Sequence, residues 1–179
     1  MLMRLAAVLA LCLALAGCVL EADPPLFKEA DGVLLFGAGP VSFAGWSLDK
    51  GAWVQEHPDD PHMTLVASDH HYDMTVPNTS THTDDHAMVL FTALDGGWYG
   101  VQMTETGKKP VYILAKLDGA DVLLTPVACS ELTDKAVALD KIDMHDGDCT
   151  VKPGTDGKML LSAIAGKLDA PKQKLVPVK

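Results

Sequence analysis

The sequence lacks the features that most directly identify an integral membrane protein or a hydrolase. The apolar run that begins after Arg4 closes at Cys18, short of the roughly 20 residues that a helix needs to cross a bilayer of about 30 Å. Neither the zinc-protease pattern His-Glu-x-x-His nor the nucleophile elbow Gly-x-Ser-x-Gly occurs. Gly37-Ala38-Gly39 is not followed by the lysine of a phosphate-binding loop. We therefore expect a protein without enzymatic activity.

Basic residues are also scarce. The chain has 14 Lys and Arg against 24 Asp and Glu, a formal net charge of −10. Nucleic acids and anionic lipid surfaces are bound through neutralised phosphates, which an acidic protein does not favour. We expect no nucleic-acid partner, and we interpret most of the acidic excess as a contribution to solubility.

The apolar run ends in a recognisable motif. Leu15-Ala16-Gly17-Cys18 resembles the lipobox of bacterial lipoproteins, and it follows a positive residue and an apolar stretch, as in a secretory signal peptide. The resemblance implies that residues 1–17 are a signal peptide and that Cys18 becomes the lipidated first residue of the mature protein. Its acyl chains would anchor the protein in a membrane. The alternatives are an ordinary signal peptide or a short membrane helix that happens to contain cysteine.

The resemblance also implies a location and a division of the chain. In that family an aspartate after the lipidated cysteine favours inner-membrane retention in many Gram-negative bacteria, and Val19 stands at this position. We therefore expect the periplasmic face of the outer membrane, with surface display as the alternative. Residues 18–30 contain Pro24-Pro25 and are interpreted as the lipidated N-terminus and a tether. Residues 31–170 are expected to form a single β-rich periplasmic domain, followed by a polar tail over 171–179.

Asp-Gly pairs between apolar runs predict a mainly β fold. The clearest hairpin joins 111–117 to 120–125 around Asp118-Gly119, and the runs 87–94 and 98–105 extend it to a four-stranded antiparallel meander. Further short strands are predicted upstream, which favours a sandwich or a small barrel. These upstream strands are 33–36, 41–43, 53–55, 63–67 and 72–76.

Two segments interrupt the β pattern. Residues 130–139 predict a short helix that starts near Ser130, and residues 158–168 predict a C-terminal amphipathic helix that covers one face or mouth of the sheet. The three tryptophans are expected in the core, with a ligand groove as the alternative. They are Trp46, Trp53 and Trp98.

The cysteines predict one disulfide. If Cys12 leaves with the signal peptide and Cys18 carries lipid, Cys129 and Cys149 remain in an oxidising compartment, where two leftover thiols usually pair. Closing a loop of about 20 residues is worth roughly 3 kcal/mol by loop entropy. Their spacing is unlike Cys-x-x-Cys, so we expect a structural bridge and not a redox pair.

Histidines are concentrated in one stretch. Six of the seven lie between positions 57 and 86, among several aspartates, and imidazole with carboxylate is a suitable ligand set for zinc or copper. His82 and His86 are four residues apart, but the preceding 77–81 segment argues against a helix there. The alternative is a polar loop or edge hairpin without chemical function. The candidate metal ligands are His57, His62, His70, His82 and His86.

A second resemblance concerns the hairpin and the cysteine pair. Tyr112 to Gly119, followed by Cys129, Cys149 and a terminal helix, resembles uncharacterised small alphaproteobacterial lipoproteins, a group that brings no established activity. Two functions therefore remain. The first is a non-enzymatic binding or envelope-interaction module, anchored to the membrane, without a cofactor, whose partner is an envelope protein or the cell wall. The second is a periplasmic lipoprotein that binds a transition metal through residues 57–86. A small hydrolase ranks third.

Overall fold

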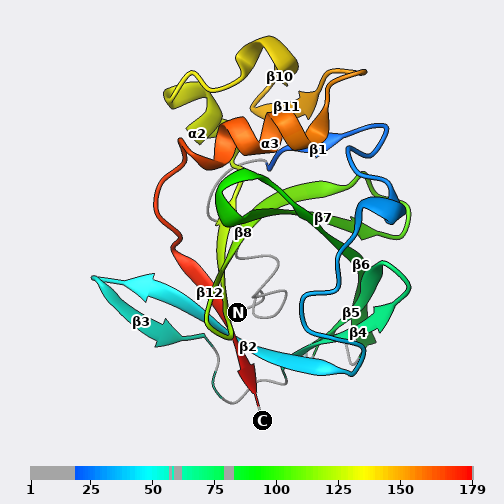
Figure 1. The fold of residues 1–179 in the computed structure, drawn as a ribbon. Coiled ribbons are helices and arrows are strands. Elements are labelled where there is room, and N and C mark those ends of the chain that lie inside the picture. The colour runs from blue at the N-terminus through cyan, green and yellow to red at the C-terminus, as the bar shows by residue number, and fades with distance from the viewer. Residues whose placement is uncertain (1–18, 57, 59–61, 79–82, 179) are drawn as a thin grey trace.

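The computed structural model describes residues 19–56, 58, 62–78 and 83–178, and within them the chain is mainly β with short helices (Figure 1). The mainly β prediction is confirmed. The helices are α2 (Cys129–Asp134) and α3 (Gly157–Ala165). The strands are β1 (Glu21–Ala22), β2 (Val41–Asp49), β3 (Ala52–Gln55), β4 (Met63–Ser68), β5 (His71–Asn78), β6 (Thr83–Ala93), β7 (Trp98–Glu105), β8 (Val111–Asp118), β9 (Asp121–Pro126), β10 (Ile142–His145), β11 (Asp148–Val151) and β12 (Gln173–Val178).

In the described part of the chain, eight strands close into an antiparallel barrel. The order around the barrel is β2, β4, β5, β6, β7, β8, β9 and β12, and β12 returns to β2. The meander from β6 to β9 is therefore as predicted. The Asp118-Gly119 hairpin also forms, but Asp118 pairs with Asp121, so Gly119 and Ala120 are the two loop residues. Gly119 has φ +62° at the first loop position, where type II′ turns favour glycine.

Apolar side chains from all eight strands fill the barrel interior. Strand side chains alternate between two faces, and the inward set includes Phe43, Tyr72 and Phe91. Residues 33–36 were expected to be a strand, but they form no regular element. Instead, the ring of Phe36 lies 5.1 Å from that of Phe43 and 5.6 Å from that of Tyr72, centroid to centroid. This apolar run is thus part of the barrel core.

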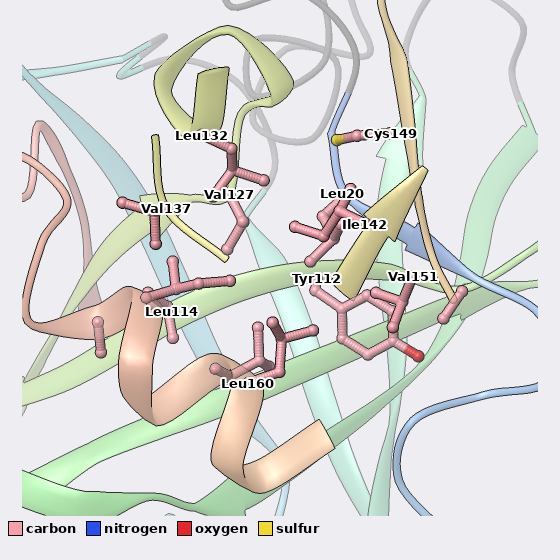
Figure 2. Packing of buried hydrophobic residues seen from close by; sticks show 14 of the residues in the cluster. Leu20, Tyr112, Leu114, Val127, Leu132, Val137, Ile142, Cys149, Val151 and Leu160 are labelled. Atoms are coloured by element: carbon pink, nitrogen blue, oxygen red, sulfur yellow. The ribbon is translucent and has the colours of Figure 1, made fainter. Parts of the chain in front are cut away.

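A second apolar layer covers the outer face of β6, β7 and β8. We call β1, α2, β10, β11 and α3 the cap; Figure 1 shows them gathered at the top of the barrel. Their buried residues form one cluster with outward-facing strand residues such as Leu114, and Figure 2 shows Leu20, Val137 and Leu160 converging there. Gly100 on β7 permits the close approach, because a Cβ there would lie 2.9 Å from the Phe27 ring and 3.0 Å from Leu161 Cδ1.

The predicted boundaries at both ends are wrong. Residues 19–27 are not a tether: β1 pairs with β8 and β11, and Leu20, Ala22 and Phe27 are buried in the cap. Residues 171–179 are not a polar tail, because 173–178 form β12, which places Leu175 in the barrel interior. In both segments, burial of a few apolar side chains holds the segment in the fold, although prolines and charged residues surround them in the sequence. The folded domain therefore extends from 19 to 178 within the described residues.

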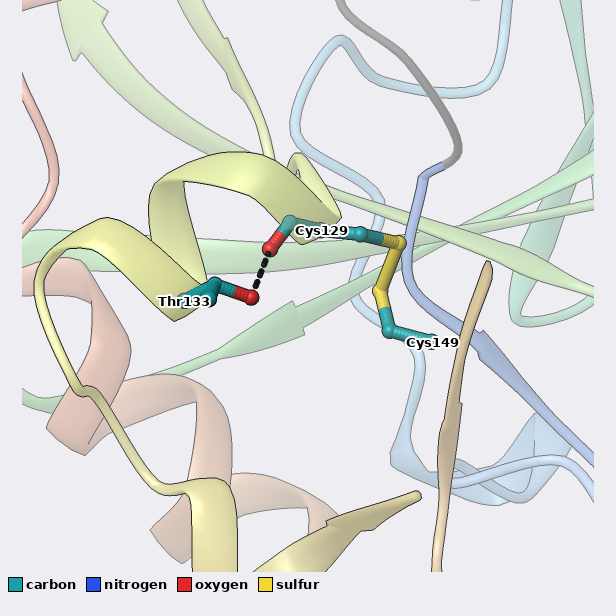
Figure 3. Close-up of a disulfide and its surroundings, with 3 residues drawn as sticks. All are labelled: Cys129, Thr133 and Cys149. Atoms are coloured by element: carbon teal, nitrogen blue, oxygen red, sulfur yellow. Dashed lines mark hydrogen bonds between the residues drawn. A yellow bond between two sulfur atoms is a disulfide. The ribbon is translucent and has the colours of Figure 1, made fainter. Parts of the chain in front are cut away.

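The predicted disulfide is present. Cys129 at the start of α2 and Cys149 on β11 are bonded, 20 residues apart (Figure 3). Thr133 Oγ1 donates to the Cys129 carbonyl oxygen at 3.0 Å. Both predicted helices also form, although α2 ends at Asp134, sooner than expected. Ala136 and Ala138 have φ values of +51° and +53°, which are incompatible with a continuing right-handed helix.

Candidate functional site

Of the five candidate histidines, the three that the structure describes are not grouped in a metal site. His57 and His82 lie outside the described residues. His70 is exposed at the turn between β4 and β5, whereas His86 lies on β6 with Nδ1 3.3 Å from Thr75 Oγ1. His62 precedes β4. Among the residues that the structure describes, no three His, Cys, Asp or Glu side chains are grouped to hold a metal. Metal binding stays a sequence-based prediction.

His71, which was not proposed as a ligand, has two acidic neighbours. Its Nδ1 lies 2.8 Å from Glu29 Oε1 and its Nε2 lies 3.6 Å from Asp73 Oδ1. Glu29 belongs to the 3-10 turn Glu29–Asp31, which lies close to β6. This contact links the N-terminal segment to β5. It could not be found from the sequence, because 42 residues separate the two side chains.

The residue next to the proposed lipidation site is fixed in the fold. Val19 forms an isolated β-bridge with Ala128, and Leu20 N donates to Val127 O at 2.9 Å. Leu20 O accepts from Tyr112 N at 3.1 Å. Cys18 itself lies outside the described residues. Any group attached at Cys18 is therefore one residue away from a position in the cap.

A buried polar network holds the following segment against the barrel. Tyr112 Oη accepts from Leu26 N at 2.8 Å and donates to Gln102 Oε1 at 3.0 Å. Gln102 Oε1 also accepts from Phe27 N at 3.1 Å. Burial raises the pKa of Tyr112 to about 12, although the hydrogen bond from Leu26 opposes the shift. The phenol is protonated at neutral pH and acts as a structural donor and acceptor.

The cap also contains a pocket of about 620 Å³. It lies between α3, the 3-10 turn Leu139–Lys141 and the loop that follows β11. Val137 and Leu160 line it with buried apolar surface, and three lysines also line it. These are Lys141, Lys152 and Lys167. They come from separate segments, so no single sequence motif marks them.

A third feature lies on the outside of the barrel. Lys174 Nζ is 5.3 Å from the centroid of the Trp46 ring and 5.2 Å from that of Trp53, within the range of cation–π attraction. The same Nζ lies 3.2 Å from Asp121 Oδ2. Trp46 and Trp53 are thus half-buried on the β2–β3 hairpin and are not in the core, contrary to expectation. The protein's own lysine occupies the space between these rings.

No protein-family model matches the chain, and no curated protein or solved structure is significantly similar to it. Within the described ranges, none of the helices has the length and apolar character needed to cross a membrane.

Proposed function

We propose that this protein is a lipid-anchored envelope protein whose non-enzymatic domain binds a ligand or partner close to the membrane. The lipobox-like residues Leu15 to Cys18 support the anchor. The observation that carries the proposal further is the bridge between Val19 and Ala128. A lipid on Cys18 would be joined to the cap without a flexible linker, so the cap would lie at the membrane surface.

The disulfide supports the same compartment. Bridges such as Cys129–Cys149 persist in oxidising environments, which include the bacterial periplasm. Val19, the residue after Cys18, favours outer-membrane over inner-membrane sorting by the rule of the lipoprotein family. Together these features support an anchored position at the periplasmic face of the outer membrane.

Metabolic labelling tests the anchor. Cells expressing the full chain are fed an alkyne-bearing fatty acid, and the purified protein is examined for label and for removal of residues 1–17 by mass spectrometry. We expect label in the parent and none in Cys18→Ser. Cys12→Ser is the matched control, because it removes a cysteine of the same apolar run and should keep the label. A fully labelled Cys18→Ser variant would refute the anchor.

Membrane fractionation tests the location. The parent is expected in the outer-membrane fraction, and Val19→Asp is expected to move it to the inner membrane by the family sorting rule. Recovery of the labelled parent in the inner membrane would contradict the assigned location while leaving the anchor intact.

A further inference from the structure

We propose that the cap pocket binds a small anionic amphiphile, a molecule in which one carboxylate or phosphate group is attached to a short apolar chain. Apolar wall residues and a rim of lysines meet in this pocket. The inference deepens the proposed binding role by naming a ligand class. It does not depend on a lipid at Cys18.

The apolar surface of the pocket suits an alkyl chain. Its volume of about 620 Å³ falls within the roughly 300–1,000 Å³ typical of small-molecule sites. Val137 and Leu160 are 1% and 3% exposed and supply rigid walls, and Ala163 lines the pocket from α3. Met159 also lines it and is 72% exposed. Methionine is a flexible side chain that adapts to apolar ligands, and burying it is favourable.

The charges around the pocket favour an anion over a neutral or cationic group. Lys141 Nζ lies 3.2 Å from Asp140 Oδ2, and Lys152 Nζ lies 3.7 Å from Asp143 Oδ1. Lys167 also lines the pocket, and its Nζ has no ion-pair partner among the described residues. Three lysines and two aspartates, Asp140 and Asp156, line the pocket, so its lining has a formal excess of one positive charge in a chain whose net charge is −10. An incoming anion could pair with Lys167 without displacing a carboxylate.

The N-terminus of α3 is not available to the anionic group of a ligand, because Asp156 already caps it. Asp156 Oδ1 accepts a hydrogen bond from Met159 N at 3.0 Å and caps α3. Its carboxylate thus already occupies the N-terminus of this helix, where an anion would otherwise be favoured. We therefore place the ligand's anionic group at the lysines and its apolar chain along Leu160 and Met159.

The walls are held in place before a ligand arrives. Lys152 N donates to Lys141 O at 2.9 Å, joining the two lysine-bearing segments. Thr155 Oγ1 donates to Lys152 O at 2.8 Å and fixes the loop that leads into α3. Binding to a preformed site costs less ordering of the protein than binding to a flexible one.

Isothermal titration of residues 19–179 with dodecanoate, kept below its micelle concentration, tests the proposal. This part of the chain contains every barrel strand and both bridged cysteines, and near-UV circular dichroism verifies folding of each variant. We expect one saturable site. Ala163→Trp should abolish binding by filling the pocket, since Ala163 is exposed and tolerates a larger side chain. Lys167→Ala should weaken binding about tenfold, corresponding to the loss of one charge-assisted contact.

Lys158→Ala is the matched control. Lys158 is on α3, whereas Lys167 follows this helix; Lys158 Nζ lies 3.3 Å from Asp31 Oδ1, and Lys158 does not line the pocket. Its affinity for dodecanoate should equal that of the parent. Absence of saturable binding, or equal binding by the parent and the folded Ala163→Trp variant, would overturn the proposal.

Three further probes separate the chemistry of the ligand. Dodecyl phosphate should bind as dodecanoate does, whereas dodecyl maltoside and inorganic phosphate should bind much more weakly. Equal binding of the maltoside would refute the role of the lysines, and equal binding of inorganic phosphate would refute the role of the apolar surface. None of these results changes the fatty-acid labelling of Cys18, so failure of the pocket and failure of the anchor can be distinguished.

Discussion

Replacing Leu20 with alanine tests whether the residues after Cys18 belong to the fold. The Leu20 side chain is 0% exposed and lies in the cap cluster. Leu-to-Ala substitutions in cores cost about 2–5 kcal/mol, through lost transfer free energy and the cavity that remains. The backbone hydrogen bonds of Leu20 to Val127 and Tyr112 do not involve the side chain, so the variant keeps them. We expect the free energy of unfolding to fall by about 3 kcal/mol.

Urea and thermal unfolding measure this loss. For a domain of this size, about 1 kcal/mol shifts the melting temperature by roughly 2–4 °C, so a decrease of about 6–12 °C is expected. Leu48→Ala is the control: Leu48 is 40% exposed on β2, and its loss should cost less than about 1 kcal/mol. If Leu20→Ala destabilised no more than Leu48→Ala, residues 19–27 would behave as a tether. A lipid on Cys18 would then be joined to the cap through a flexible segment, and the cap would not be held at the membrane.

Three further predictions concern stability. Replacing Cys129 and Cys149 together by alanine should lower the free energy of unfolding by about 3 kcal/mol, measured by urea titration, and added reductant should destabilise only the parent. Gly100→Ala should cost about 1–3 kcal/mol because its Cβ would overlap Phe27 and Leu161, whereas Gly39→Ala, with nothing within 4 Å of the added Cβ, should leave the melting temperature nearly unchanged. Burial, and then a hydrogen bond with Asp169, raises the pKa of Glu131, so the folded state binds this proton more tightly and stability falls as pH rises through the raised pKa. Glu131→Gln should therefore melt higher than the parent at pH 7, and this difference should vanish below the ordinary glutamate pKa of 4.5; a pH-independent difference would contradict the assignment.

The central meander could be predicted because the sequence features that specify it are close in the chain to the residues that pair. From β6 to β9, apolar alternation and the glycines of short turns lie within a few residues of the pairs that they specify. The disulfide was predictable for a different reason, since few cysteines remained once the N-terminal pair was assigned. Both predictions needed little knowledge of distant contacts.

The ends of the domain could not be predicted in this way. β12 pairs Gln173 with Ser47 and with Leu124, and neither partner is near it in sequence. In the sequence, Lys174 and Pro177 make this segment look polar and irregular, although Leu175 faces the barrel interior. Residues 33–36 gave the opposite error, because an apolar run can serve as a core segment without pairing as a strand.

The cap pocket could not be predicted from the sequence either. Lys141, Lys152 and Lys167 lie on three segments that only the folding of α3 against the β10–β11 hairpin brings together. In sequence, they are separate charges in an acidic protein. The histidine stretch is conspicuous because it is contiguous, yet the described histidines there are not grouped with other ligands.

The position of β12 between β9 and β2 has a consequence for how the protein is made. A chain that folds as it emerges from the export machinery, N-terminus first, exposes one edge of β2 and one edge of β9 until residues 173–178 follow. Open edges of this kind pair with other chains and promote aggregation. Early termination or proteolysis just before Gln173 would leave the barrel open, with two aggregation-prone edges. Residues 173–178 are therefore needed to close the barrel and to prevent aggregation through these edges.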